Sequence, residues 1–444
     1  MSEPLGRALA RMEASARILA LIKLANVGLT LIWGFAVTYV FVRALPLREF
    51  QSFLLLVAFG NFTISAEFGL TSIIYARLRR HWLGNMGLGT RQDDAGGFRL
   101  EEMGVLFLFL GLLILGGFAI LLVAFALGGL HSGMPLLFLL FFLSACLNLP
   151  ALLAKRTLAA VDGNFLWEAL DCLRRVMTIA LLLFILQGLD PRLSLALQLF
   201  VSMAVIGYAI ALVHRRLGME ARHWLSFRVG GGHVRLHYLR DIGASAAFTI
   251  SEILAYNAPY FTIAAATHDA RPMLIFDFFF KMSRSLSMLV RATVEAALPR
   301  ITRAFHAGDS ARLRQLMGRA LGVALFFAVS ASGALMLFGE WLFAKLFDGR
   351  AAIDRIDLLL IGGALLALAV ICVSVYVQGA LGRFTLLLGR SLPFLAGSLL
   401  SVPLARIFAP ERFDLLFLIL YTLTLFVAAA IHGASLRQLV GRRP

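Results

Sequence analysis

Apolar runs of about 20 residues recur along the whole chain, and they limit its fold more than any other feature. Each run is long enough to cross about 30 Å of hydrocarbon as an α-helix. None shows the alternating ten-residue pattern of a membrane β-strand, so we expect helical spans. The sequence predicts twelve spans, each end placed to within about four residues, at 18–42, 52–75, 104–127, 134–153, 170–188, 193–214, 242–266, 273–298, 318–345, 356–381, 384–407 and 413–433.

Composition supports this prediction, because 60% of the 444 residues are hydrophobic and only 15% are charged. Such values indicate an all-α polytopic membrane protein and exclude a soluble domain. The basic segment 215–241 divides the spans, which predicts a six-helix lobe at 1–214, a cytoplasmic linker at 215–241 and a second six-helix lobe at 242–444. The two halves open alike, with a polar span, a short turn, a charged span and a basic segment. We therefore expect a transporter with a central cavity between two pseudo-equivalent lobes.

The net charge of +16 follows the predicted topology. Basic residues concentrate in the segments after spans two, four, six and eight and in the C-terminal tail. The positive-inside rule therefore predicts that both termini are cytoplasmic. We interpret the surplus charge as an orientation signal with affinity for anionic lipid headgroups, and we expect no nucleic-acid partner.

A row of charges interrupts span eight, in the stretch FDFFFKMSRSLSMLVRATVEAALPRI at 276–301. At 100° per residue the row falls within an arc of roughly 80°. A charge that faces lipid at mid-span costs about 2.5–3.5 kcal/mol, so the row must face protein or a water-filled cavity. Two interpretations remain: ion pairs four residues apart, or a polar cavity wall. The charges are Asp277, Lys281, Arg284, Arg291 and Glu295, and Met288 lies in the same arc.

Three other predicted spans carry polar faces at matching positions of the two halves. Span seven has Ser245, Thr249, Glu252, Tyr256 and Tyr260 on one face, while spans one and two hold Lys23, Asn26, Thr30, Asn61, Ser65, Glu67 and Thr71. The predicted substrate-binding residues of the cavity are Lys23, Asn26, Asn61, Glu67, Glu252, Tyr256, Tyr260, Asp277, Lys281, Arg284 and Arg291. Glu168, Asp171, Arg174 and Arg175 mark the inner end of span five, where we expect an interfacial role with the side chains reaching toward the headgroups.

No pattern in the sequence is typical of an active site. His233 and His237 are four residues apart, but the Glu that a zinc protease needs is missing between them. Cys146, Cys172 and Cys372 fall inside predicted spans without paired spacing. We therefore expect no catalytic residue, no metal site and no cofactor, and we predict that the chain is not an enzyme.

The stretches LPRITRAFHAGDSARLRQLMGRALG, FGEWLFAKLFDGRAAIDRIDLLLIGG and VQGALGRFTLLLGRSL, within 298–392, carry a family resemblance. They combine Pro299 at the end of span eight, Gly308-Asp309 before an amphipathic segment, and a Gly382-Arg383 turn between spans ten and eleven. The opening stretch at 42–81 has a turn with an acidic residue and Phe before a Gly-containing span. The chain resembles the multidrug/oligosaccharidyl-lipid/polysaccharide (MOP) exporter superfamily and, within it, the Wzx-type polysaccharide and O-antigen flippases.

This resemblance implies two lobes that form a V around a central cavity and work by alternating access. It implies an undecaprenyl-diphosphate-linked oligosaccharide as substrate, flipped across the bacterial inner membrane for lipopolysaccharide biosynthesis, with transient contact to polysaccharide polymerase machinery. The resemblance assigns diphosphate contacts to Lys23, Lys281, Arg284 and Arg291, and sugar contacts or a coupling ion to Glu67, Glu252, Asp277, Tyr256, Tyr260, Asn26 and Asn61. Asp309 or Ser310 is expected to cap the helix that follows.

Other functions remain open at this point. Four basic and four acidic groups line the predicted cavity, so charge alone does not separate an anionic from a cationic substrate. The alternatives are another exporter of the superfamily, namely a peptidoglycan lipid II flippase or a multidrug antiporter, and a membrane glycan polymerase or ligase. The short predicted outer loops disfavour the polymerase and the ligase, because such enzymes display a large outer loop.

Overall fold

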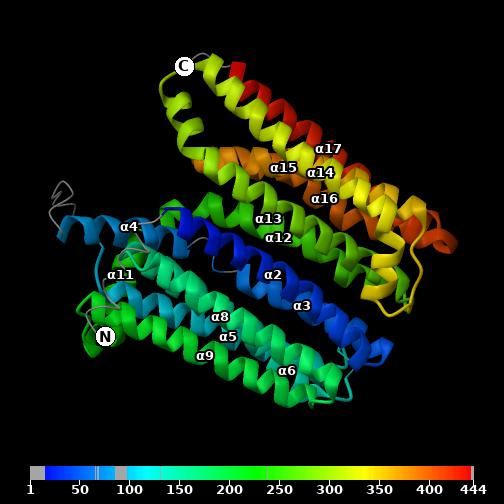
Figure 1. Ribbon diagram of the computed structural model, residues 1–444, viewed down its shortest axis with the longest axis horizontal. Helices are drawn as coiled ribbons and strands as arrows, with labels where there is room; N and C mark the ends of the chain where they lie inside the picture. The colour runs from blue at the N-terminus through cyan, green and yellow to red at the C-terminus, as the bar shows by residue number, and fades with distance from the viewer. Residues whose placement is uncertain are drawn as a thin grey trace. The chain divides into compact units, whose positions relative to one another are not determined.

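A computed structural model describes residues 16–65, 67, 70–85, 98–130, 132–237 and 239–441. This part of the chain contains sixteen α-helices, α2 to α17, two 3-10 helices and no strand (Figure 1). The chain divides into two compact units. Unit 1 comprises Met1–Ala44 and Phe59–Ala246, and unit 2 comprises Leu45–Ala58 and Ala247–Pro444. The predicted division at 1–214, 215–241 and 242–444 stays a prediction.

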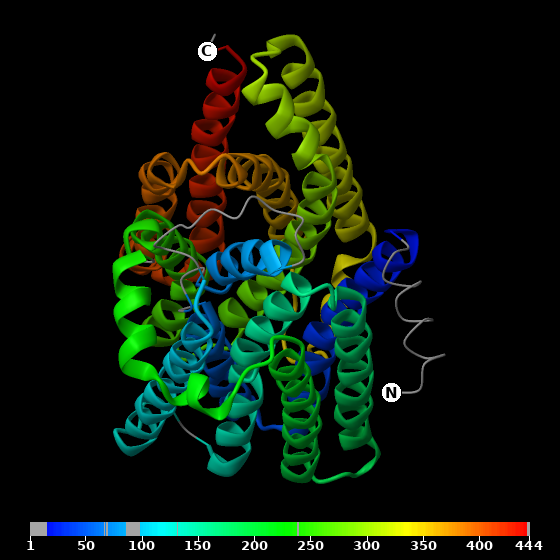
Figure 2. The ribbon, with the colours of Figure 1, turned by 90° about the vertical axis from the view of Figure 1, so that its left-hand side faces the viewer.

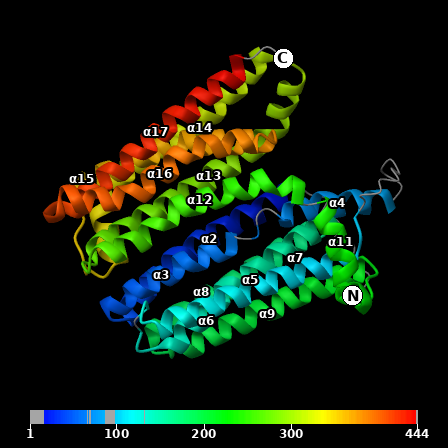
Figure 3. The same ribbon diagram turned by 180° about the vertical axis from the view of Figure 1, so that it is seen from behind.

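Unit 1 is built from helices that follow one another along the first half of the chain. They are α2 (Ala16–Ala44), α4 (Leu70–Asn85), α5 (Glu101–Ala126), α6 (Pro135–Cys146), α7 (Asn148–Ala160), α8 (Asn164–Phe184), α9 (Pro191–Arg216), α10 (Ala221–Leu225) and α11 (Phe227–His237). Helices α3 (Leu47–Ser65) and α12 (Leu239–Ala266) cross the boundary between the units. Helix α6 packs against α5 and α9, and α8 packs against α2, α7 and α9 (Figures 1 and 3).

Unit 2 contains α13 (Arg271–His306), α14 (Ser310–Leu346), α15 (Arg355–Ala380), α16 (Phe384–Phe408) and α17 (Phe413–Gly441). Helix α15 packs against α13, α14 and α17, and most of its side chains are buried. An aromatic cluster fills the core: the ring of Tyr421 meets those of Phe276 and Phe279 edge-on, each at 5.5 Å. Such edge-to-face pairs stabilise a core beyond the area that they bury.

Eight helical segments within the described residues are long and apolar enough to cross a membrane. They match eight of the twelve predicted spans. The other four predicted spans correspond to α3–α4, α8, α12 and α13. Helices α8 and α13 miss the composition expected of a span because charged side chains lie along them. Their charges are therefore the place to look for function, since charges within a membrane span are usually functional.

Two short turns match the motifs of the sequence. Asp309 is the N-cap of α14, with its Oδ1 accepting a hydrogen bond from Arg312 N at 2.9 Å, so the predicted cap is confirmed. Gly308 has φ +69° between α13 and α14, and Gly382 has φ +71° between α15 and α16. Both conformations favour glycine. Helix α13 itself continues past position 299 to His306.

The predicted cytoplasmic linker folds back onto unit 1. Helices α10 and α11 pack against α5, and the buried His233 Nε2 lies 3.0 Å from Glu102 Oε1. The backbones meet closely, because a Cβ on Gly104 would lie 2.4 Å from the carbonyl oxygen of Trp224. The basic segment after predicted span two, at 76–103, is described only up to 85 and from 98 onward.

We expect Gly104→Ala to lower the stability of unit 1 by about 1–3 kcal/mol, because the added methyl group forces α10 away from α5. The measurement is the thermal unfolding midpoint of the purified protein in detergent. Gly111→Ala is the matched control on the same helix, since a Cβ there meets nothing within 4 Å. That control should be neutral or stabilise by up to about 1 kcal/mol. Equal midpoints for the two variants would contradict the close packing of α10 on α5.

Candidate functional site

The charge row of α13 changes its surroundings along the helix. Asp277 is 1% exposed, and it accepts a hydrogen bond from the buried Tyr260 hydroxyl at 2.8 Å through its Oδ1. The Lys281 ammonium pairs with the other oxygen of the same carboxylate, and its side chain is 13% exposed. The spacing of four residues predicted the contact of Asp277 with Lys281, while the role of Tyr260, Asp277 and Lys281 in substrate binding stays a prediction. Together they form a compact, neutralised group.

A second group lies further along the same two helices. Arg291 Nε lies 2.7 Å from Glu295 Oε1, and both side chains are about half exposed, at 52% and 51%. The half-buried Glu252 of α12 interacts electrostatically with Arg291. The ring of Tyr256, one turn on, packs on Phe394 with centroids 5.1 Å apart. Both ion pairs that the spacing of four residues predicted are thus present.

Arg284 lies between these two groups and is exposed. It is thirteen residues along α13 from Arg271, which corresponds to about 20 Å of helix. In a helix that crosses a hydrocarbon layer of about 30 Å from the Arg271 end, a residue at that distance lies within the layer. Lipid is therefore an unfavourable neighbour for this side chain, and water or a ligand is a favourable one.

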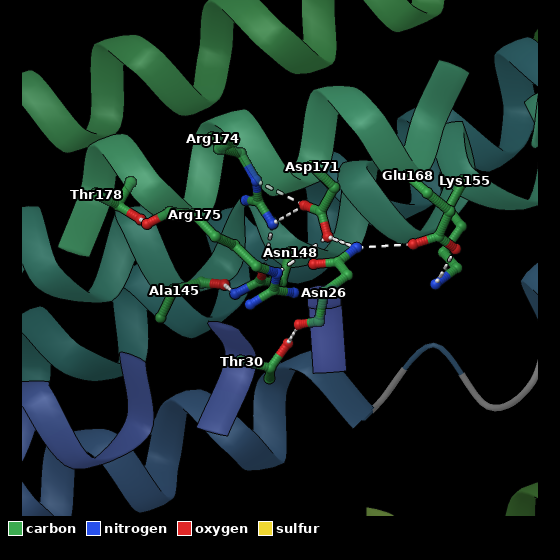
Figure 4. A network of polar contacts seen from close by, with 10 residues as sticks. All are labelled: Asn26, Thr30, Ala145, Asn148, Lys155, Glu168, Asp171, Arg174, Arg175 and Thr178. Atoms are coloured by element: carbon green, nitrogen blue, oxygen red, sulfur yellow. Dashed lines mark hydrogen bonds and ion pairs between the residues drawn. The ribbon is translucent and has the colours of Figure 1, made fainter. Parts of the chain in front are cut away.

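Unit 1 contains a larger buried network, which joins α2, α7 and α8 (Figure 4). Asn26 of α2 is 5% exposed. Its Nδ2 donates to Glu168 Oε2 at 2.7 Å and to Asp171 Oδ2 at 2.8 Å, so one amide group holds two carboxylates of α8. Lys155 Nζ of α7 lies 3.1 Å from the second oxygen of Glu168. The network ties α2 to the middle of the unit.

Two guanidinium groups complete the neutralisation of Asp171. Arg174 Nη2 lies 2.7 Å from Asp171 Oδ1 and 3.4 Å from the side-chain oxygen of Asn148, and Arg175 Nε lies 3.0 Å from Asp171 Oδ2. The two acids and two arginines were expected at the interface with their heads toward the headgroups. That expectation is wrong for Glu168, Asp171 and Arg174, which are 1%, 4% and 6% exposed. The reason is that α2 and α7 cover this face of α8 and offer hydrogen-bonding partners there.

The remaining predicted residues of unit 1 have diverse surroundings. Lys23 of α2 is exposed, three residues from the buried Asn26. Asn61 of α3 is half-buried. Glu67 has a local role, because its Oε2 accepts a hydrogen bond from Thr71 N at 3.0 Å at the start of α4. Ser245, at the predicted polar face of span seven, lies outside the residues whose side chains the structure describes.

Charges at the start of α13, at the other end of this helix from Arg291 and Glu295, are also paired. Arg271 at the start of α13 contacts Asp354 at 2.7 Å, Asp357 at 3.3 Å and Asp414 at 2.5 Å, which joins α13 to α15 and α17. Among the described residues no group of three or more His, Cys, Asp and Glu side chains is arranged to hold a metal ion. Buried acidic groups of the polar interior are thus paired with basic groups, and the side chains of Arg284 and Lys23 are exposed.

Comparison with solved structures finds this architecture in membrane transporters. A mutant of the Vibrio cholerae MATE transporter VcmN matches with a TM-score of 0.60 and 15% identity, over 98% of this chain and 100% of that chain. The chain has the fold of the MATE transporters. An inward-facing and an outward-facing structure, each described as a multidrug resistance MATE family transporter of the MOP superfamily, both give a TM-score of 0.63 at 14% identity. They cover 95% of this chain and, respectively, 98% and 94% of their own chains.

The MATE fold has twelve transmembrane helices in two lobes, so the predicted fold class is confirmed. Helices α8, α12 and α13 and the α3–α4 pair are the four predicted spans that composition alone does not identify. Two of the similar structures are described as members of the MOP superfamily, and at 14% identity they show a shared fold. A scan against protein-family models and a search of curated proteins found no match to this sequence.

Proposed function

We propose that this chain is an exporter of the MOP superfamily that carries an anionic substrate by alternating access. The observation behind the proposal is Arg284, a basic side chain exposed about 20 Å along α13. A basic side chain that is accessible at that position can bind an anionic group of a substrate. Exported substrates with a diphosphate head group are anionic. Arginine binds phosphate oxygens in a bidentate manner.

Three buried acidic groups, Asp277, Glu168 and Asp171, support the same sign of substrate. Lys281 and Tyr260 hold Asp277, while Lys155, Arg174 and Asn26 hold Glu168 and Asp171. Carboxylates that already interact with basic groups attract an incoming cation weakly. A site for a cationic drug is better served by a carboxylate without a basic partner. This contrast favours an anionic over a cationic substrate.

Within the anionic class we propose the undecaprenyl-diphosphate-linked oligosaccharide suggested by the sequence motifs. Its lipid tail stays in the bilayer while Arg284 and Arg291 hold the diphosphate. The alternative is a multidrug antiporter, which the fold favours because the similar structures are multidrug resistance transporters. The neutralised acids are the specific observation against that alternative. The predicted place of the substrate site, in a cavity between the lobes, remains part of the proposal.

We further propose that the protein resides in the bacterial inner membrane with its basic helix ends in the cytoplasm. At the end of unit 2 where α13 meets α14, the arginines of both helices are exposed. Between positions 296 and 339 the sequence contains one acidic residue, Asp309. The opposite end carries Arg271 among three aspartates. The positive-inside rule assigns the first end to the cytoplasm.

Depletion of the protein in its own cells tests the proposal. We expect a diphosphate-linked oligosaccharide to accumulate on the cytoplasmic face of the inner membrane, as detected by lipid extraction and by protection from an added glycan-modifying enzyme. Unpolymerised glycan on the outer face would instead favour a polymerase or ligase. Normal glycan with raised sensitivity to cationic drugs would favour the multidrug antiporter.

A further inference from the structure

We propose that the turn end of the α13–α14 hairpin is a binding surface for anionic phospholipid headgroups of the adjacent leaflet. Five arginines are exposed there, on two helices that pack together: Arg300, Arg303, Arg312, Arg314 and Arg319. The proposal concerns a surface of unit 2 alone, and it does not depend on the transported substrate.

The turn that connects the two helices is short and well defined. Asp309 N donates to Ala304 O at 3.1 Å and Gly308 N donates to Phe305 O at 3.2 Å, which closes the end of α13. Gly308 takes φ +69°, and the Asp309 carboxylate caps α14. The arginines on both sides of this turn are therefore displayed by rigid helix rather than by a loop.

Helix length places part of this surface at the depth of lipid phosphates. Arg300 is 29 residues from the first residue of α13, and Arg319 is 27 residues from the last residue of α14. These separations correspond to about 43 Å and about 40 Å of helix. A bilayer with its headgroup regions is about 40–45 Å thick. When the Arg271 end lies in one headgroup region, Arg300 and Arg319 reach the other.

The charge of this end is unbalanced, unlike that of the opposite end. Within the described part of the chain none of the five guanidinium groups forms an ion pair, and the Asp309 carboxylate is already used by the helix cap. At the other end Arg271 meets three aspartates, and Arg355 lies 3.5 Å from Glu340. Figure 2 looks onto the basic end, where the turn between α13 and α14 and the end of α17 are visible. The exposed Arg437 of α17 adds to the same end of unit 2.

An anionic bilayer surface fits these features better than a soluble partner does. The arginines are spread over two helices at headgroup depth, whereas a soluble acidic protein would reach only the tip around Arg312. Each basic residue near an anionic membrane contributes about fivefold in affinity. The partner is thus a phospholipid such as phosphatidylglycerol, bound through its phosphate.

The test uses the purified full-length protein in detergent, titrated with phosphatidylglycerol or with phosphatidylcholine. Retained lipid is counted by native mass spectrometry, and the thermal unfolding midpoint is recorded in parallel. We expect phosphatidylglycerol to bind and to raise the midpoint, and phosphatidylcholine to do neither. The double variant Arg300→Gln/Arg319→Gln should bind phosphatidylglycerol about 30-fold more weakly.

The matched control is Arg406→Gln/Arg412→Gln, which removes two exposed arginines near the opposite end of unit 2. It should leave lipid binding unchanged, and Arg300→Lys/Arg319→Lys should keep most of it because the charge remains. Raised salt should weaken binding to the wild-type protein. Equal loss in both Gln variants, no preference for phosphatidylglycerol, or binding of a poly-glutamate peptide in its place would overturn the proposal.

Discussion

Arg284→Gln is expected to abolish most transport while the protein still inserts and folds. The exposed guanidinium lies about 20 Å along α13, where its charge is positioned to attract an anionic substrate. A hydrogen bond to a charged group contributes about 1.5–3 kcal/mol, so the rate at limiting substrate should fall by about 10- to 150-fold. The measurement is translocation of the lipid-linked glycan by reconstituted protein.

Two further variants separate substrate binding from structure. Arg284→Lys keeps the charge and should retain part of the activity. Glu295→Gln removes the partner of Arg291 at a half-exposed ion pair and should change stability by only about 0–1 kcal/mol. Normal transport by Arg284→Gln would show that the row on α13 serves ion pairing alone, which was the other interpretation open from the sequence.

Asp171→Ala is expected to be the most destabilising change in unit 1. Asp171 accepts hydrogen bonds from Asn26, Arg174 and Arg175, and the Arg174 side chain is only 8% exposed. Removing one partner of a buried ion pair leaves the other charge uncompensated, which costs about 3–5 kcal/mol. The thermal unfolding midpoint in detergent should therefore fall by many degrees.

Glu340→Ala is the control for this prediction. Its ion pair with Arg355 is exposed, with 57% and 84% of the two side chains accessible and a separation of 3.5 Å. Such pairs contribute about 0–1 kcal/mol. If Asp171→Ala had no more effect than Glu340→Ala, the network of Asn26, Asp171 and Arg174 would not hold α2 against α8.

Local sequence patterns predicted much of the fold, because a membrane span requires a long apolar run. The Asp309 cap and the Gly382 turn were also predictable, since each depends on a few neighbouring residues. The packing of α10 and α11 against α5 could not be predicted from local patterns. It rests on close backbone contact at Gly104, and a glycine inside an apolar helix gives no hint of its neighbour.

In the candidate site, too, contacts within one helix were predictable and contacts between distant helices were not. Helical spacing correctly predicted the pairs of Asp277 with Lys281 and of Arg291 with Glu295, because both partners lie on one helix. It missed the burial of Glu168 and Asp171, whose shared partner Asn26 is 142 and 145 residues away in sequence. One signal was available: the charges of α8 share a face, as do those of α13. Their closeness to a predicted span end favoured the interface instead.

Transport by the purified protein in sealed vesicles tests the proposed anionic substrate most directly. Two substrates are compared in the same preparation: a fluorescent undecaprenyl-diphosphate oligosaccharide, and a cationic dye under an imposed proton or sodium gradient. The account predicts translocation of the diphosphate lipid, lost in Arg284→Gln, and no movement of the dye. Gradient-driven transport of the dye that is unaffected by Arg284→Gln, with the glycan lipid left in place, would contradict it.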